Sequence, residues 1–343
     1  MDALLALAEQ SPKFWGGFRY PLLTGLIALL ITWALTPLVR KMAFKHGAID
    51  DPKRDDRRIH KEPLPRWGGI AIFVGIAVAI IAVLPFAFPT TNPYPLYLIG
   101  ILVVGACLVV AGVLDDLYQY SAKIQLAILL GAGVAIQFFD GTIGRIHIKT
   151  IGVPFTDQYI PLLWAAIPLT AIYIFIVTKT MDTIDGVDGL ASGIAAISAG
   201  TLMTIAVYEG QPRVAIIAAA VGGACIGFLR HNYNPAKIIM GTGGAYILGF
   251  MLACLSIVGA VKTAAALTLI IPIFVFGVPI FDAIQVVIRR KLSGVPITQA
   301  DKRHLHHQLL KRGLSQRQTV WVLYLAAAAL CGALIFIILT NHG

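Results

Sequence analysis

The segment 167–207 reads IPLTAIYIFIVTKTMDTIDGVDGLASGIAAISAGTLMTIAV. Like the rest of the chain, it consists of long apolar stretches separated by short charged segments. Two apolar blocks, near 161–178 and 189–207, flank four charged side chains, those of Lys179, Asp182, Asp185 and Asp188. A helix of about 20 apolar residues crosses the ~30 Å hydrocarbon core of a membrane. The pattern therefore predicts two membrane helices joined by a short acidic segment.

Apolar blocks of this kind recur along the whole chain. Of the 343 residues, 58% are hydrophobic and 13% are charged, whereas a soluble chain averages about 25% charged residues. The sequence predicts an all-α polytopic membrane protein with about ten transmembrane helices. We expect one integral-membrane domain over 1–343, with a surface segment at 1–20 and long loops at 40–67 and 289–319. The predicted spans lie near 21–40, 68–88, 96–114, 124–139, 161–178, 189–207, 212–229, 239–260, 264–288 and 320–340.

The basic residues are distributed unevenly between the two faces of this arrangement. The formal net charge is +10, and 21 of the 27 Lys and Arg residues fall in segments that share one face. The positive-inside rule places that face in the cytoplasm and both termini outside. Insertion topology and anionic headgroups explain the charge without a nucleic-acid partner. The outer segment 141–155, GTIGRIHIKTIGVPF, alternates apolar and polar residues and predicts a small extracytoplasmic β-hairpin.

Most carboxylates outside the first loop lie at the predicted cytoplasmic ends of the spans. Asp115 and Asp116 end the third span, and Asp282 precedes the basic end of the ninth. Carboxylates this close to a membrane are costly and usually face a polar cavity. Mg²⁺ prefers oxygen ligands, commonly one or two carboxylates together with phosphates and water. The alternative is that these carboxylates form structural ion pairs with nearby Lys and Arg residues.

The last long loop adds a second polar group. In ADKRHLHHQLLKRGLSQRQ (300–318), His304, His306 and His307 alternate with basic residues. No nearby cysteine completes a zinc site, whereas imidazole and guanidinium donors suit phosphate oxygens. A solvated amphipathic loop is the alternative reading. Carboxylates for Mg²⁺ and a basic surface for phosphate on one face together favour phosphoryl transfer in a cleft at that face.

Six segments along the chain are GAIDDPKRDDRRIHKEPLPRWGGIAIF (47–73), GVLDDLYQYSAK (112–123), DTIDGVDGLASG (182–193), NYNPAKIIMGTGGAYILGFML (232–252), PIFDAIQVVIRR (279–290) and ADKRHLHHQLLKRGLS (300–315). In this order they resemble the polyprenyl-phosphate N-acetylhexosamine-1-phosphate transferases, the family of the WecA/TagO and MraY enzymes. The spacing HLHH is similar to the WecA/TagO branch.

The resemblance implies a reaction and a set of roles. A polyprenyl phosphate attacks the β-phosphorus of a UDP-linked N-acetylhexosamine, most simply UDP-GlcNAc, and UMP leaves; Mg²⁺ assists, with Mn²⁺ as an alternative. It also admits a homodimer. The implied catalytic residues are Asp115, Asp116, Asp185, His306 and His307. Asp182 is expected to join Asp115 and Asp116 at the metal. The expected substrate-binding residues are Asp188, Lys179, His304, His60, Arg66, Arg230, Asn232, Thr242 and Arg303; Asp282 and Arg289 also match recurring family positions.

Three departures from the family pattern suggest a rearranged site. Thr242 stands where the family has a metal-binding aspartate, and Gln125 where it has a basic residue. Lys179 and Asp182 stand where the family has two asparagines. The two losses and two gains balance in charge, which suggests that Asp182 replaces the missing aspartate and Lys179 the missing cation.

Other functions remain as alternatives. The departures also fit an inactive or altered-specificity paralogue. A secondary transporter would use intramembrane carboxylates for ion coupling, but it predicts charges near mid-span and an internal repeat. A lipid-phosphate phosphatase would not predict the six family segments.

Overall fold

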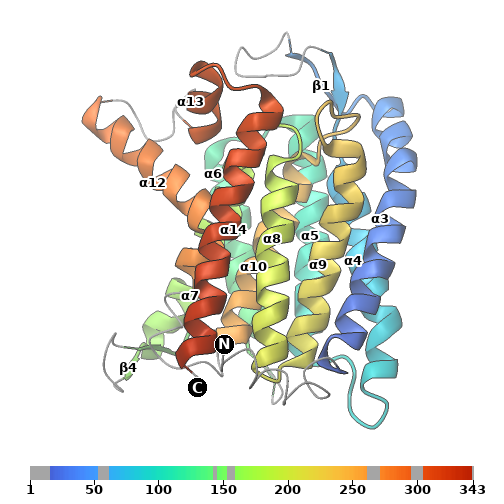
Figure 1. Cartoon of the computed structure of the whole chain (residues 1–343), viewed down its shortest axis with the longest axis vertical. Helices are drawn as coiled ribbons and strands as arrows, with labels where there is room; N and C mark the ends of the chain where they lie inside the picture. The colour runs from blue at the N-terminus through green and yellow to red at the C-terminus, as the bar shows by residue number, and fades with distance from the viewer. Residues whose placement is uncertain are drawn as a thin grey trace.

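The computed structural model describes residues 16–52, 62–141, 145–152, 159–260, 271–294 and 304–341. These residues form a bundle of long apolar helices with short connections (Figure 1). The helices are α3 (Arg19–Lys45), α4 (Gly68–Ala87), α5 (Leu96–Tyr118), α6 (Ala122–Ala135), α7 (Ala166–Ile184), α8 (Leu190–Tyr208), α9 (Pro212–Asn232), α10 (Gly241–Ala260), α12 (Gly277–Leu292), α13 (Leu305–Lys311) and α14 (Gln316–Asn341).

Within the described residues, eight helices are long and apolar enough to cross a membrane, so the predicted polytopic membrane fold is confirmed. The predicted fourth span, 124–139, is shorter: α6 ends at Ala135 and a 3₁₀ turn, η2 (Ile136–Phe138), continues it. The predicted ninth span, 264–288, lies partly outside the described residues, and its described end is α12.

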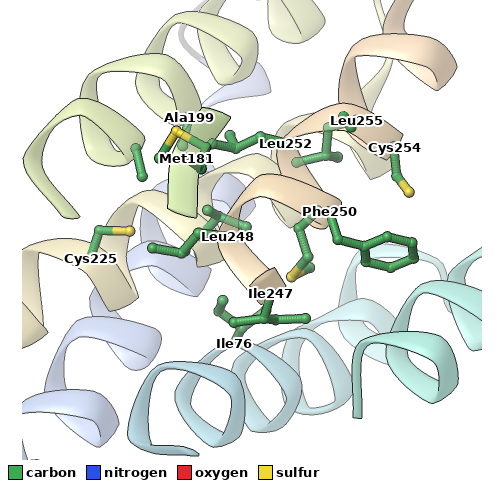
Figure 2. Close-up of a cluster of buried hydrophobic side chains, with 14 of the residues drawn as sticks. Ile76, Met181, Ala199, Cys225, Ile247, Leu248, Phe250, Leu252, Cys254 and Leu255 are labelled. Carbon is green, nitrogen blue, oxygen red and sulfur yellow. The ribbon is translucent and has the colours of Figure 1, made fainter. Parts of the chain in front are cut away.

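Helix α10 forms the centre of the bundle. It is the most buried of the eight spans, and it packs against α4, α5, α7, α8 and α9. Figure 2 shows Ile247, Leu248 and Phe250 of α10 among side chains from the surrounding helices, including Ile76 of α4 and Met181 of α7. Lipid tails are as apolar as these side chains, so close packing has to supply the attraction between helices.

Glycines bring α10 into backbone contact with the two helices that carry the carboxylates. A Cβ at Gly112 of α5 would collide with the backbone of Gly243. A Cβ at Gly249 would lie 2.5 Å from the Thr178 Cα of α7. Because small residues allow such close approach, the ends of α5 and α7 are held together through α10.

Two short strand pairs and one short helix mark the ends of the bundle. At the end that is uppermost in Figure 1, β1 (Ile49–Asp50) pairs antiparallel with β2 (Leu64–Pro65), and α13 lies at this same end. At the opposite end, β3 (Thr150–Gly152) pairs antiparallel with β4 (Tyr159–Pro161), with Ile151 opposite Ile160. The predicted small hairpin is therefore present, and its second strand lies beyond the segment that predicted it. A 3₁₀ turn, η3 (Leu163–Ala165), leads from β4 into α7.

Candidate active site

The predicted site residues gather at the end of the bundle that carries β1 and α13. Asp115 and Asp116 lie in the last turn of α5, and Asp182 lies in the last turn of α7. Asp185 caps α7, and the turn 185–189 leads into α8. Each carboxylate is thus carried by the end of a rigid helix rather than by a long loop.

Asp116 is held by a buried ion pair. The Arg66 guanidinium donates to Asp116 Oδ1 at 2.9 Å and to Asp50 Oδ1 at 2.6 Å, and the Asp116 side chain is only 1% exposed. Thr242 donates from both its backbone N–H and its hydroxyl to Asp116 Oδ1, each at 3.1 Å. Burial lowers the pKa of Arg66, but the two carboxylates outweigh it and raise that pKa above its ordinary value. Arg66 therefore stays charged.

Asp115 belongs to a chain of hydrogen bonds that crosses three helices. Gln125 of α6 donates from Nε2 to Asp115 Oδ1 and Oδ2 at 3.3 and 3.2 Å. The Lys179 ammonium donates to Gln125 Oε1 at 2.9 Å and to Asp182 Oδ2 at 2.6 Å. The backbone N–H of Tyr120 also donates to Asp115 Oδ1, at 2.7 Å. Lys179 thus lies beside Gln125, the position at which a basic residue is missing from the family pattern.

Asp185 and the histidine helix meet at Gly186. A Cβ at Gly186 would lie 2.7 Å from His306 Nε2, so the imidazole packs directly on this backbone. Burial, together with the negative charge of Asp182, raises the pKa of Asp185 well above its usual range. The acidic segment and the histidine motif, more than 100 residues apart in sequence, therefore form one site.

The histidines are positioned by Asp282 of α12. His304 Nδ1 lies 2.7 Å from Asp282 Oδ2, and the Leu305 N–H donates to Asp282 Oδ1 at 2.6 Å. The His306 ring stacks on that of His304 and lies 4.4 Å, between centroids, from that of His307. Burial lowers the pKa of His306 to about 3, helped by the neighbouring His307. His306 is therefore neutral at physiological pH, with one ring nitrogen a donor and the other an acceptor.

Asp188 faces the loop after α9. Its Oδ2 accepts from Asn234 Nδ2 at 3.0 Å and from the Ala236 N–H at 3.1 Å. Asn234 also donates to Gln316 Oε1 of α14 at 2.6 Å. Asn232 is buried, and its amide accepts from the Gly189 N–H and donates to the Ile238 carbonyl, which fixes the turn 185–189 against α9.

The remaining predicted residues lie at helix ends or outside the described part of the chain. Arg230 is exposed in the last turn of α9, and Arg289 lies in the last turn of α12. His60 and Arg303 lie outside the described residues.

Three further residues belong to the site although the sequence did not single them out. Asp50 shares Arg66 with Asp116, Asn234 donates to Asp188, and Gln316 accepts from Asn234. Asp50 stands in an acidic and basic loop that reads as a solvated linker. Asn234 and Gln316 have no charge pattern of their own; only their position inside matched segments, or beside one, distinguishes them.

The donor set suits a divalent ion that shares its ligands with a substrate. Among the described residues, no three His, Cys, Asp or Glu side chains are arranged to hold a metal ion by themselves. Mg²⁺ does not need such a cage, because it commonly takes one or two carboxylates and fills its octahedron with phosphate oxygens and water. Asp182 lies close enough to Asp185 for its charge to add to the effect of burial on that carboxyl, and a cation between such carboxylates would favour their ionised forms.

Comparison with known proteins gives one consistent family. Residues 98–260 match Glycosyl transferase family 4. The chain is 36% identical over 88% of its length to the "Probable undecaprenyl-phosphate N-acetylglucosaminyl 1-phosphate transferase" of Bacillus subtilis (strain 168), covering 80% of that protein. It is 31% identical over 95% of its length to the "Decaprenyl-phosphate N-acetylglucosaminephosphotransferase" of Mycolicibacterium smegmatis (strain ATCC 700084 / mc(2)155), covering 84% of it.

A more distant relative agrees. The "Undecaprenyl-phosphate alpha-N-acetylglucosaminyl 1-phosphate transferase" of Escherichia coli (strain K12) is 25% identical over 90% of this chain and 81% of its own. These matches extend along nearly the whole chain, and their region includes both the carboxylate-bearing helices and the glycines that join them. The chain therefore belongs to glycosyl transferase family 4, among the WecA/TagO-like polyprenyl-phosphate sugar-1-phosphate transferases.

Proposed function

We propose that this protein transfers GlcNAc-1-phosphate from UDP-GlcNAc to a polyprenyl phosphate, releases UMP, and so performs the first lipid-linked step of an envelope glycan. The observation that supports this most strongly is the contact of Gly186 with His306, which joins the carboxylates to the histidine helix. The printed names of the relatives supply the substrate class.

The chemistry assigned to each residue follows from its surroundings. We assign Asp115 and Asp116 as the carboxylates that face the lipid phosphate, and Asp185 as a further catalytic carboxylate. His304, His306 and His307 would donate hydrogen bonds to the diphosphate of the nucleotide sugar. Asp188, with one oxygen fixed by Asn234, would orient the nucleotide. Arg66 pairs with Asp116 and so compensates the charge of that buried carboxylate.

We propose Mg²⁺ as the cofactor, with Mn²⁺ as an alternative, and assign Asp115, Asp116 and Asp182 as the side chains that would share it with phosphate oxygens and water. When bound, it would neutralise the charge of the reacting phosphates. We expect Asp182→Asn to lower UMP release by at least about 100-fold, and Thr242→Asp added to it to restore part of that activity. Binding of Mn²⁺, followed by its paramagnetic resonance, should weaken in Asp182→Asn. Unchanged Mn²⁺ binding and unchanged turnover would remove Asp182 from the metal site.

We further propose that the end of the bundle with β1 and α13 faces the cytoplasm, where UDP-sugars are made. The Lys and Arg distribution supports this, because 21 of the 27 fall in segments assigned to that face. The lipid substrate reaches the same end through the membrane in which the eight spans lie.

One assay tests the function. The purified protein is incubated with Mg²⁺, polyprenyl phosphate and UDP-GlcNAc, UDP-GalNAc or UDP-glucose, and UMP is measured. We expect UMP with UDP-GlcNAc only when polyprenyl phosphate is present. UMP release with only one of the other UDP-sugars would overturn the assignment of UDP-GlcNAc as the donor. No UMP with any of the three would overturn the proposed activity.

A further inference from the structure

The hydrogen-bond chain Asp115–Gln125–Lys179–Asp182 contains a coupling that the proposed function does not explain. Its members come from α5, α6 and α7. Among these four hydrogen-bonded residues Gln125 alone is neutral, and it lies between the carboxylate of Asp115 and the ammonium of Lys179. Its two ends therefore have opposite tasks.

A carboxamide fits this place without a conflict of charge. A carboxylate needs a hydrogen-bond donor and an ammonium needs an acceptor, and Gln offers one of each. The Gln125 Nε2 donates to both oxygens of Asp115, and its Oε1 accepts from Lys179. A glutamate at 125 would repel Asp115, and a lysine would repel the ammonium of Lys179.

Lys179 is held in place but still has a donor to offer. An ammonium has three N–H groups. Two of them are used by Gln125 and Asp182, and the described residues contain no third partner for Lys179. Its side chain is 33% exposed and that of Asp182 is 20% exposed, so the pair lies at an accessible edge of the carboxylate group. An anchored ammonium with one remaining donor is suited to a phosphate oxygen.

The side chains of Lys179 and Gln125 reach the same point from two different helices, α7 and α6. The Lys179 nitrogen lies 2.9 Å from the end of the Gln125 side chain. The side chain of a lysine is longer than that of a glutamine. We therefore expect the ammonium of a lysine at 125 to extend from α6 toward the place that the Lys179 ammonium now occupies. A glutamine at 179 would then supply the neutral carboxamide in place of Gln125.

We propose that Lys179 and Gln125 form one functional unit, in which Lys179 binds a phosphate of the nucleotide substrate and Gln125 is the positioning residue that couples it to Asp115. This inference rests on the proposed function. It goes further because it makes α6 part of the site and predicts that residues 125 and 179 can exchange roles.

The test is a reciprocal exchange, Gln125→Lys with Lys179→Gln, measured beside each single variant. We expect each single variant to lower kcat/KM for UDP-GlcNAc by about tenfold or more, and the double variant to recover at least about tenfold relative to the worse single variant. The exposed Lys123 of α6 provides a matched control, because Lys123→Gln removes one positive charge two residues away from Gln125. It should leave kcat/KM unchanged.

A binding measurement separates a phosphate contact from a merely structural role. We expect Lys179→Gln to weaken binding of UDP about tenfold and to leave binding of uridine, which has no phosphate, unchanged. An equal loss for both ligands would overturn the assignment of Lys179 to phosphate. A double variant no better than the worse single variant would overturn the coupling.

The outcome is distinguishable from failure of the proposed function. If the native protein binds UDP but releases no UMP, the enzymatic activity fails while the UDP and uridine comparison still tests the Lys179–Gln125 unit. If UMP is released and the exchange does not rescue, the enzyme stands and this inference falls.

Discussion

At the scale of single residues, Arg66 shows how this site stabilises a buried carboxylate. It bridges Asp116 and Asp50, and Asp116 is 1% exposed. Removing one partner of a buried ion pair costs about 3–5 kcal/mol, because the remaining charge is left without compensation. We expect Arg66→Ala to lower the free energy of unfolding by about 3 kcal/mol, measured by thermal unfolding in detergent.

An exposed arginine provides the comparison. Arg145 pairs with Asp140, and their side chains are 49% and 39% exposed. Exposed pairs contribute about 0–1 kcal/mol. Arg145→Ala should therefore leave the unfolding temperature nearly unchanged. Equal losses in the two variants would show that the Arg66 bridges do not stabilise the fold.

The low pKa of His306 predicts how stability depends on pH. In the folded protein the pKa is about 3, whereas an unfolded histidine has a pKa of about 6.5. Between these values the unfolded state binds more protons, so stability falls as pH falls below about 6.5, by about 1 kcal/mol over the first pH unit. We expect His306→Gln to reduce this slope in unfolding temperatures measured from pH 7.5 to 5.

Exposed His46 is the matched control, because its ring lies at the surface near the end of α3. His46→Gln should keep the slope of the native protein. If His306→Gln keeps it as well, the acid sensitivity does not come from burial of that imidazole.

At the scale of elements, the turn 185–189 and helix α13 depend on a glycine. A Cβ at Gly186 would lie 2.7 Å from His306 Nε2 and 3.0 Å from Cε1, so an alanine has to displace a buried ring. We expect Gly186→Ala to lower turnover at least about tenfold with only a small change in unfolding temperature, since α13 is short and moves more easily than a span.

Gly200 of α8 is the control, because a Cβ there has no atom within 4 Å. Alanine is favoured over glycine inside a helix by up to about 1 kcal/mol. Gly200→Ala should keep full turnover and unfold at the same or a slightly higher temperature. Full turnover in Gly186→Ala would mean that the contact with His306 has no part in activity.

The elements also show what the sequence can and cannot predict. Long apolar blocks identify the spans, because the required length and composition are local properties. The block at 124–139 looked similar, but α6 ends at Ala135, and nothing local in the apolar pattern marks that end. The contacts of Lys179 with Gln125 and of Arg66 with Asp116 join residues about 50 positions apart. They depend on how α6 packs against α7 and on how the segment before α4 meets the end of α5, which one sequence does not reveal.

At the scale of the whole molecule, the asymmetry between the two ends has a physical basis. The end with β1 and α13 carries the acidic site and, among the described residues, most of the Lys and Arg. The other end carries the β3–β4 hairpin, and exposed aromatic side chains lie at both ends, Phe138 and Trp164 here and Tyr118 and Trp321 at the site end. Aromatic rings are favoured where a membrane meets water. The molecule is therefore built to lie in a bilayer with chemically different faces.

This asymmetry predicts the orientation in the cell. In a background with the exposed Cys107 replaced by serine, Lys45→Cys places a thiol at the site end, and Thr90→Cys places one in the exposed loop after α4. The positive-inside rule puts Lys45 in the cytoplasm. A membrane-impermeant maleimide should then label Thr90→Cys in intact cells, and Lys45→Cys only after permeabilisation. The reverse pattern would place the carboxylates outside, away from cytoplasmic UDP-sugars, and the proposed reaction could not occur at this site.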